Sequence, residues 1–335
     1  MAGVTLRTMG QAVLSTASCI TLGASAALSA WGADDAATFP SKPIRIVVPT
    51  QTAGLPDIMA RLIGPKLFEV WKQTVVVENR AGAGGIIGTE IVAKAIADGY
   101  TLILVSGNAH VATPAVRVKL PYDTLRDFAG ITVTATSAYA LVVTPSLNAR
   151  SVQELVALTK ASPGQLNFAS AGIGSGTHFA AELFNELNGM RAVHVAYRGI
   201  PEALTDTVAG RAQFFMAPLA SAIPLVRDGK LRMLAVSKHM AGFDEGIPTF
   251  AESGVRGYEW DAWTGLLVPA KTPRTIIDKL NREVSRILNL RDVKERMTAL
   301  GVDTVPTTPA QLDKLIADQV ALTTNIARKA GIKAE

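Results

Sequence analysis

Short apolar runs alternate with amphipathic segments along the chain after about residue 40. The runs at 44–48, 75–77 and 101–105 are rich in β-branched and aliphatic residues, a composition typical of strands. Apolar residues in the segments between such runs recur every three or four positions, which is the spacing of one helix face. The alternation continues to the end of the chain, so the sequence predicts two α/β domains with mostly parallel sheets.

The junction at residues 167–178 is unusually rich in glycine and in small hydroxyl side chains. Apolar residues at helical spacing follow from Phe179, so the segment predicts a strand, a glycine loop and a helix. Glycines let backbone N–H groups turn inward, and the first helical turn adds unpaired donors with a partial positive charge, which suits a carboxylate or a phosphate. An ordinary turn, with Ser175 or Thr177 as N-cap and Gly189 as C-cap, fits the same residues equally well.

Other strand ends also lead into small polar loops or helix starts. Pro56 and Asp57 follow the strand at 44–48 and stand where a helix begins, so that Asp57 is favoured as a cap over a direct ligand contact. The strand at 101–105 is followed by a predicted loop at 106–110. Loops at the carboxyl ends of parallel strands meet at one edge of a sheet, so we expect these junctions to face one crevice.

Two side chains near these junctions allow more than one interpretation. His110 has no histidine or carboxylate at metal-ligand spacing, so we expect a surface or hydrogen-bonded histidine. Arg198 follows the predicted strand at 192–196 and could either clamp a carboxylate with two hydrogen bonds or form a surface ion pair. The residues alone do not decide between these two roles.

Motifs for cofactors, metals and catalysis are missing. The glycine cluster at 82–88 is one residue longer than a dinucleotide fingerprint, and no acidic residue closes the strand that follows at 101–106, so we interpret these glycines as backbone adaptation at a helix start. The chain has no G-x-S-x-G, C-x-x-C or H-E-x-x-H motif and no P-loop lysine. We therefore expect no catalytic residues, no metal and no cofactor.

Composition narrows the class of protein further. Of the 335 residues, 48% are hydrophobic and 18% charged, which fits a compact globular chain and excludes a disordered one. The formal net charge is +5, but lysine and arginine are scattered and do not interleave with aromatic residues, so we expect no nucleic-acid partner.

The first 32 residues predict a secretory signal peptide. Arg7 precedes an uncharged stretch from about Ala12 to Ala30, and small residues follow where a signal peptidase cuts. A membrane anchor is the rival interpretation, but serine, threonine and glycine make the stretch poorly apolar. Cleavage would remove Cys19, the one cysteine, and leave a periplasmic chain without disulfides.

Seven short segments in order carry a family resemblance. They are Asp57-x-x-Ala60-Arg61 and residues 75–85, 98–102, 167–170, 194–199, 229–232 and 247–252. Together they closely resemble the Bug-type receptors, the extracytoplasmic solute-binding proteins of tripartite tricarboxylate transporters. The resemblance covers about residues 43–332.

The resemblance implies a fold of the periplasmic-binding-protein type II kind, in which two α/β domains joined by two crossover strands close over a ligand in the cleft between them. Domain one would comprise 40–140 and 265–335, and domain two 141–264. The crossover strands would lie near 139–144 and 263–268.

The implied function is capture of a small organic carboxylate for membrane permease subunits, with no chemistry done on the ligand. A receptor that instead signals to a sensor kinase is a second possibility. A dinucleotide-dependent α/β oxidoreductase is a third, and the signal segment argues against it.

The resemblance and the junctions together predict a set of ligand-binding residues, seven from domain one and eight from domain two. They are Thr50, Gln51, Ala53, Gly54, Asp57, Ser106, Asn108, Ser170, Gly172, Gly174, Ser175, Thr177, His178, Tyr197 and Arg198. The sequence departs from the family at Thr50, where an aromatic residue is usual, at Ala53, where a second glycine is usual, and at Ala217, where an acidic residue is usual.

Overall fold

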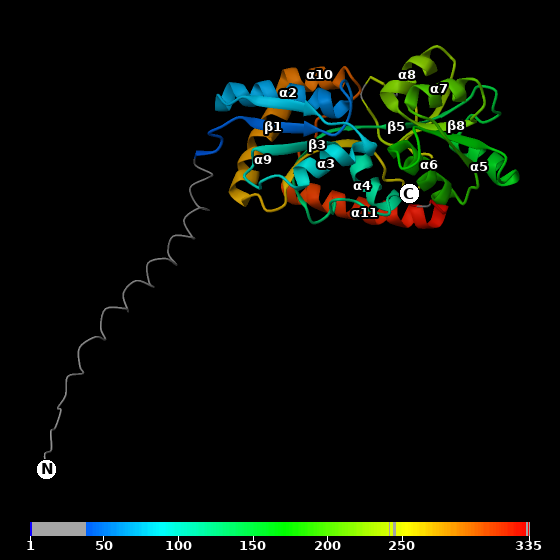
Figure 1. The fold of residues 1–335 in the computed structure, drawn as a ribbon. Helices are drawn as coiled ribbons and strands as arrows, with labels where there is room; N and C mark the ends of the chain where they lie inside the picture. The colour runs from blue at the N-terminus through cyan, green and yellow to red at the C-terminus, as the bar shows by residue number, and fades with distance from the viewer. Residues whose placement is uncertain (2–37, 241, 244–245, 333, 335) are drawn as a thin grey trace. The chain divides into compact units, whose positions relative to one another are not determined.

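The computed structural model of the chain describes Met1 and residues 38–335, except 241, 244–245, 333 and 335. Apart from Met1, the predicted signal peptide lies outside the described residues. The chain divides into two compact units, Met1–Phe39 and Pro40–Glu335. The second unit contains all the strands described below (Figure 1).

The first sheet has five strands in the order β2-β1-β3-β10-β4. Strands β1 (Ile44–Val48), β2 (Val75–Asn79) and β3 (Thr101–Ser106) are parallel. Strand β10 (Ala262–Pro269) runs antiparallel to both β3 and β4 (Phe128–Ser137).

The second sheet has the order β7-β6-β8-β5-β9. Strands β6 (Asn167–Ser170), β7 (Val193–Ala196) and β8 (Phe214–Pro218) are parallel. Strand β5 (Tyr139–Val143) runs antiparallel to β8 and to β9 (Arg232–Val236).

In each sheet four strands run in one direction and a single strand, β10 or β5, runs against them, so the prediction of mostly parallel sheets is confirmed. The chain enters the second sheet through Ala138, between β4 and β5, and returns to the first through residues 237–261, between β9 and β10. Strands β5 and β10, which lie where the sequence predicted the crossovers, are the ones that run against their neighbours. The domain boundaries proposed from the sequence remain a prediction.

Helices surround both sheets. Near the first sheet lie α2 (Leu55–Trp71), the short 3-10 turn η1 (Ala83–Gly85), α3 (Ile86–Ala93), α4 (Gly107–Val116), α9 (Arg274–Leu288), α10 (Arg291–Thr298) and α11 (Pro309–Ala330). Near the second lie α5 (Val152–Ala161), α6 (Gly176–Asn188), α7 (Ile200–Val208) and α8 (Leu219–Arg227).

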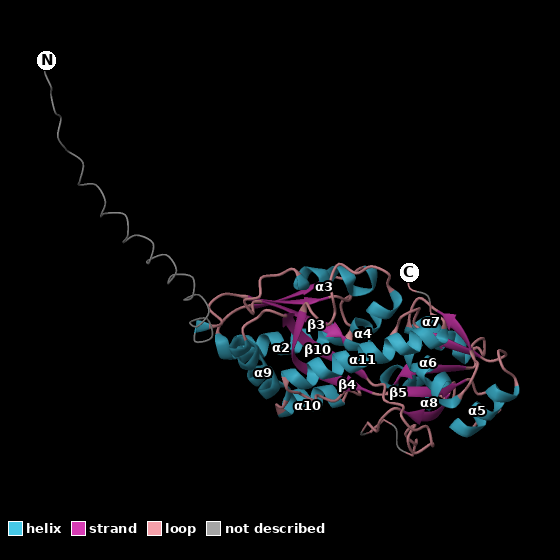
Figure 2. Cartoon of the chain, turned by 90° about the horizontal axis from the view of Figure 1, so that it is seen from below, coloured by secondary structure: helices cyan, strands magenta, loops and turns pink. Residues whose placement is uncertain are grey.

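Helix α11 links the two sheet regions. It packs on β4 and α4, and its other contacts include α6 beside the second sheet (Figure 2). Aliphatic and aromatic residues from both sheets form one continuous buried cluster, and a second cluster fills the space between the second sheet, α7 and α8. No helix in the described part of the chain is long and apolar enough to cross a membrane.

The segment at 106–110 differs from its predicted loop. Strand β3 ends at Ser106 and α4 begins directly at Gly107. A Cβ at Gly107 would lie 2.1 Å from ring atoms of Trp263, so close packing against β10 requires glycine at this turn. Gly107, one of the small residues that suggested a loop, is therefore needed for this close packing.

His110 is also placed differently from the prediction. Helix α4 turns it into the core, where it is 5% exposed and meets the ring of Phe128 edge-on at 5.4 Å between centroids. Its Nε2 has no hydrogen-bond partner among the described residues, and burial lowers the pKa of the imidazole to about 4. The expectation of a surface or hydrogen-bonded histidine was wrong because helix α4 was not foreseen.

Candidate functional site

The predicted site residues come from four junctions, at the carboxyl ends of β1, β3, β6 and β7. At each of them the chain turns within a few residues into the N-terminus of a helix, namely α2, α4, α6 and α7. The β6–α6 junction is the glycine loop that the sequence singled out. Its caps are the predicted ones, because Ser175 Oγ accepts a hydrogen bond from the His178 amide at 3.2 Å and Gly189 ends the helix with φ +58°.

The amides of the two loop glycines are already bonded within the loop region. The Gly172 amide donates to Ser170 Oγ at 3.1 Å, and the Gly174 amide donates to His178 Nδ1 at 3.2 Å. These two amides are therefore engaged within the loop region in this structure, and a ligand contact at Gly172 or Gly174 stays a prediction. Both residues have positive φ, +119° and +78°, so a larger side chain at either position would strain the backbone and could not test ligand approach alone.

The other amides of the loop divide into bonded and unbonded groups. The Ala171 amide donates to Thr177 Oγ1 at 2.8 Å. The amides of Ile173, Gly176 and Thr177 have no acceptor among the described residues. The last two belong to the first turn of α6, where backbone donors are unpaired and the helix dipole is positive. These amides are the donors that the junction can offer to an anion.

Side chains of this junction mainly support the loop. Ser170, Thr177 and His178 are 0%, 3% and 2% exposed. Thr177 Oγ1 lies 2.9 Å from Ser175 Oγ as well as accepting the Ala171 amide. These side chains hold the loop in shape in this structure, and direct ligand contacts by them remain a prediction.

The structure brings the glycine loop against helix α4. A Cβ at Gly176 would lie 2.4 Å from Tyr139 Oη and 2.9 Å from Asn108 Cβ, and a Cβ at Gly174 would lie 2.8 Å from Val116. Asn108 is buried and its Nδ2 donates to the Asp261 carbonyl at 3.1 Å. Predicted residues from the two halves of the chain thus meet at the N-terminus of α6.

At the β1–α2 junction Asp57 acts within its own helix start. Its Oδ2 accepts the Ala53 amide at 3.0 Å, and its Oδ1 accepts Arg61 Nε at 2.9 Å. Burial alone would raise the pKa of this carboxyl, but the hydrogen bonds from Ala53 and Arg61 outweigh it and lower the pKa. The structure supports the capping role that the sequence favoured.

The remaining residues of that loop are more open. Gln51 and Ala53 are exposed, and Gly54 is half-buried as the N-cap of α2. Thr50 and Ser106 line a small cavity of about 20 Å³ together with His110. The two predicted loops of the first sheet therefore meet at this cavity.

Arg198, in the β7–α7 junction, does not form the surface ion pair considered from the sequence, and its role as a carboxylate clamp stays a prediction. Arg198 is exposed, and its backbone amide donates to Glu202 Oε2 at 3.1 Å. Its guanidinium forms no hydrogen bond or ion pair with the described residues. Tyr197 bonds to the side chain of Asp206, and burial together with this bond raises the pKa of its hydroxyl.

His194 was not among the site residues predicted from the sequence. Its Nε2 lies 2.6 Å from Ser170 Oγ, and its ring stacks on that of His178 at 3.8 Å between centroids. The residue stands in the segment 194–199 that carries part of the family resemblance. That position was the one signal that could have drawn attention to it.

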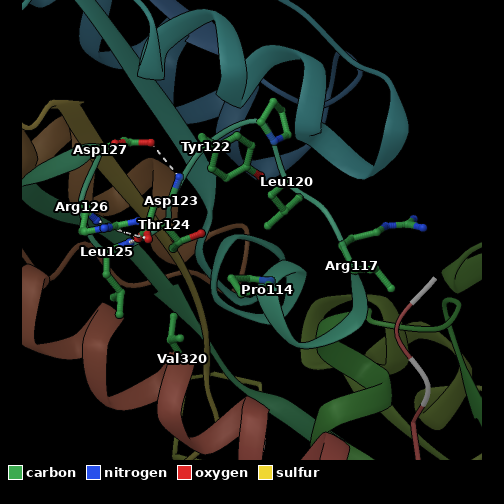
Figure 3. Close-up of a pocket in the computed structure, with 12 residues that line it drawn as sticks. Pro114, Arg117, Leu120, Tyr122, Asp123, Thr124, Leu125, Arg126, Asp127 and Val320 are labelled. Carbon is green, nitrogen blue, oxygen red and sulfur yellow. Dashed lines mark hydrogen bonds and ion pairs between the residues drawn. The ribbon is translucent and has the colours of Figure 1, made fainter.

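A separate surface pocket of about 620 Å³ lies between the segment 114–127 and Val320 of α11 (Figure 3). Arg126 Nε pairs with Asp123 Oδ2 at 2.8 Å there, and the Asp123 amide donates to Asp127 at 2.7 Å. None of the predicted site residues lines this pocket. No group of three or more metal-ligating side chains occurs in the described part of the chain.

Comparison with known proteins gives consistent matches over most of the chain. Residues 59–332 match the sequence model of the tripartite tricarboxylate transporter family receptor. Protein BugT of Bordetella pertussis is 34% identical over 298 residues, which cover 88% of this chain and 91% of that protein. A protein encoded in the tcbD-tcbE intergenic region of a Pseudomonas species is 36% identical over 284 residues, 84% of each chain.

Solved structures match as well. An R. palustris protein solved with adipate is 32% identical, with a TM-score of 0.73, and the match covers 89% of this chain and 100% of that one. MatC from Rhodopseudomonas palustris with bound malate is 30% identical, with a TM-score of 0.70, and the match covers 86% and 99% of the two chains. The periplasmic binding protein BugD is 27% identical, with a TM-score of 0.70 over 89% of this chain and all of that one.

Proposed function

We propose a function from one premise: this chain belongs to the family of tripartite tricarboxylate transporter receptors. The family resemblance and the periplasmic-binding-protein fold predicted from the sequence are confirmed. Members of this family are periplasmic solute-binding receptors, and two related structures contain the organic acids adipate and malate. The ligand class, the site and the partners of this chain are the proposal.

The proposed ligand is a small organic carboxylate held at the N-terminus of α6. This proposal rests on one observation: some backbone amides of the glycine loop are hydrogen-bonded within the loop region, and others have no acceptor. Those of Gly172 and Gly174 are bonded internally and fix the loop, whereas those of Gly176 and Thr177 remain without an acceptor at the positive end of a helix. Fixed dipoles of this kind stabilise an anion at little cost in reorganisation.

Formal positive charge contributes little to this proposed site. Arg198 is exposed, and Arg61 is paired with Asp57. The carboxylate of Asp57 already occupies the positive end of α2, so an anionic group there would meet a like charge. We therefore propose that the ligand carboxylate is bound from the α6 side, with Asn108 of α4 closing the site.

The proposed partners are membrane permease subunits, which would receive the ligand from the closed receptor, and we propose that the ligand leaves chemically unchanged. Nothing in the arrangement favours the sensor-kinase alternative over this one. Pull-down of permease subunits from membranes by the ligand-loaded protein, but not by the ligand-free protein, would support the transport role.

A thermal-shift screen tests the ligand class. The mature protein from Ala33 is heated with adipate, malate, tricarboxylates, aromatic acids, amino acids and NAD(P). A ligand at about one hundred times its dissociation constant adds about 2.7 kcal/mol of stability, which raises the melting temperature by several degrees. A shift with one class of acids supports the proposal, and a shift with NAD(P) alone would overturn it in favour of an oxidoreductase.

A further inference from the structure

Two histidines, His178 and His194, hold the glycine loop at 170–176 through hydrogen bonds to its residues. His178 lies in the first turn of α6, and His194 lies in β7, the neighbour of β6. Their rings stack with centroids 3.8 Å apart and planes 14° apart, and the ring of Phe168 stacks on His194 at 5.0 Å. Phe168 lies beside His194 on the neighbouring strand and His178 lies over the face of its ring, so these contacts limit the rotation of the His194 ring.

The bonds around His178 define its proton position. Its Nδ1 accepts the Gly174 amide at 3.2 Å, so this nitrogen carries a lone pair and the neutral ring carries its proton on Nε2. Nε2 of His178 lies 3.7 Å from Glu182 Oε1. Glu182 is the charged side chain in contact with this pair of histidines, through His178.

The bonds around His194 define its proton position in the same way. The distance of 2.6 Å from Ser170 Oγ to Nε2 is typical of a hydroxyl donor and short for an imidazole N–H donor. The Ser170 hydroxyl has two acceptors within reach, the Gly172 carbonyl at 3.2 Å and His194 Nε2 at 2.6 Å, and the shorter contact assigns its proton to His194. The Ser170 oxygen accepts the Gly172 amide at 3.1 Å. Burial and the neighbouring His178 lower the pKa of His194 to about 3, so the ring is neutral at pH 7.

Both hydrogen-bond paths lead from a glycine amide of the loop to an imidazole nitrogen. The Gly174 amide ends directly on an imidazole nitrogen of His178, and the Gly172 amide ends on one of His194 through the Ser170 hydroxyl. Bonds in such a chain strengthen one another in a low-dielectric interior. With the Gly172 and Gly174 amides bonded in this way, the amides of Gly176 and Thr177 in the first turn of α6 stay without an acceptor among the described residues.

We propose that His194 is a positioning residue of the carboxylate site, which holds the glycine loop in its binding shape by accepting the Ser170 hydroxyl while it stacks on His178. This inference rests on the proposed function for its ligand. The bracing of the loop itself does not depend on which ligand binds.

Amide hydrogen exchange and histidine ¹⁵N shifts of the ligand-free mature protein test the bracing. We expect His194 to carry its proton on Nδ1 and His178 on Nε2. His194→Phe keeps a stacking ring but removes the acceptor, so the Gly172 amide should exchange about tenfold faster, the loss that one hydrogen bond predicts. His194→Gln restores an acceptor and should return the exchange rate to within about threefold of the wild type.

His239→Phe is the matched control, because His239 is exposed and its ion pair is with Glu252, which is not part of the glycine loop. It should leave the exchange of Gly172 and Gly174 unchanged. A His194 proton on Nε2, or an unchanged Gly172 rate in His194→Phe, would overturn the proposal. Faster exchange throughout β6 and α6 in both His194→Phe and His194→Gln would also overturn it, since that result shows a packing role alone.

Binding of malate measured by calorimetry extends the test to function. We expect His194→Phe to weaken malate binding about tenfold, and His194→Gln to bind within about threefold of the wild type. If the wild-type protein binds malate but both variants bind equally well, the positioning role is wrong. If the wild type does not bind malate, the proposed ligand class is weakened, and hydrogen exchange with the ¹⁵N shifts still decides the bracing of the loop.

Discussion

The carboxylate of Asp57 accepts the backbone amide of Ala53 at 3.0 Å, across the first turn of α2. The same carboxylate accepts Arg61 Nε at 2.9 Å, and the aspartate side chain is 5% exposed. This closed arrangement fixes the loop after β1. It also places a negative charge at the N-terminus of α2, where a ligand carboxylate would meet repulsion.

Replacing Asp57 should therefore cost stability and change its pH dependence. Asp57→Ala leaves the Ala53 amide and Arg61 without their acceptor, at a cost of about 2 kcal/mol. The folded-state pKa of Asp57 is lowered, so its contribution is present above the unfolded pKa and is lost as the pH falls through the folded value. Urea unfolding at several pH values should show a smaller loss of stability below about pH 4 in Asp57→Asn than in the wild type.

Ala53 has the left-handed backbone conformation with φ +66°, which favours glycine. Ala53→Gly removes this strain but increases the freedom of the unfolded chain, so we expect a net gain below about 1 kcal/mol. Ala321→Gly, in an exposed turn of α11, is the control and should lose about 0.5 to 1 kcal/mol. If Ala53→Gly and Ala321→Gly lowered the free energy of unfolding by the same amount, the strain at Ala53 would be contradicted.

Gly176 permits the approach of α4 to the glycine loop. A Cβ there would lie 2.4 Å from Tyr139 Oη and 2.9 Å from Asn108 Cβ. We expect Gly176→Ala to weaken binding of the acid found in the thermal-shift screen by about tenfold or more, a loss of about 1.4 kcal/mol.

Gly199→Ala is the matched control for that variant. Its backbone is extended, and its Cβ would meet the ring of Pro201 at an ordinary 3.7 Å. Calorimetry should therefore find unchanged affinity in this control. Equal affinities of Gly176→Ala and the wild type would show that closure at α4 does not matter for binding.

His110 should make the protein sensitive to acid. Its pKa is lowered by burial to about 4, below the unfolded value near 6.5, so the unfolded chain binds the proton more readily between these values. Stability is therefore lost as the pH falls from 7 to 5, by about 2 kcal/mol for this one group. Denaturant unfolding of His110→Phe should show a flatter pH dependence over that range, and an unchanged slope would contradict the assignment.

Arg198 should matter little for stability. Its guanidinium is exposed and forms no bond with the described residues. Arg198→Ala should change the free energy of unfolding by less than about 0.5 kcal/mol. For ligand affinity, a loss above about 2 kcal/mol in calorimetry would restore the carboxylate clamp considered from the sequence.

The sequence by itself determined the local features of the site. The caps at Ser175 and Gly189 and the helix start at Asp57 were predicted because each depends on bonds between residues three or four positions apart. Many of the strands and helices followed from hydrophobic spacing, although α4 was not foreseen, and the fold and family followed from the ordered motifs.

Only the tertiary structure decided what meets at the glycine loop. His194 reaches Ser170 because β7 pairs beside β6, and Asn108 reaches Gly176 because α4 packs on α6. The burial of His110 and the direction of β10 were decided in the same way. These contacts join residues far apart in the chain, and their geometry depends on sheet order and helix packing, which no local pattern of residues specifies.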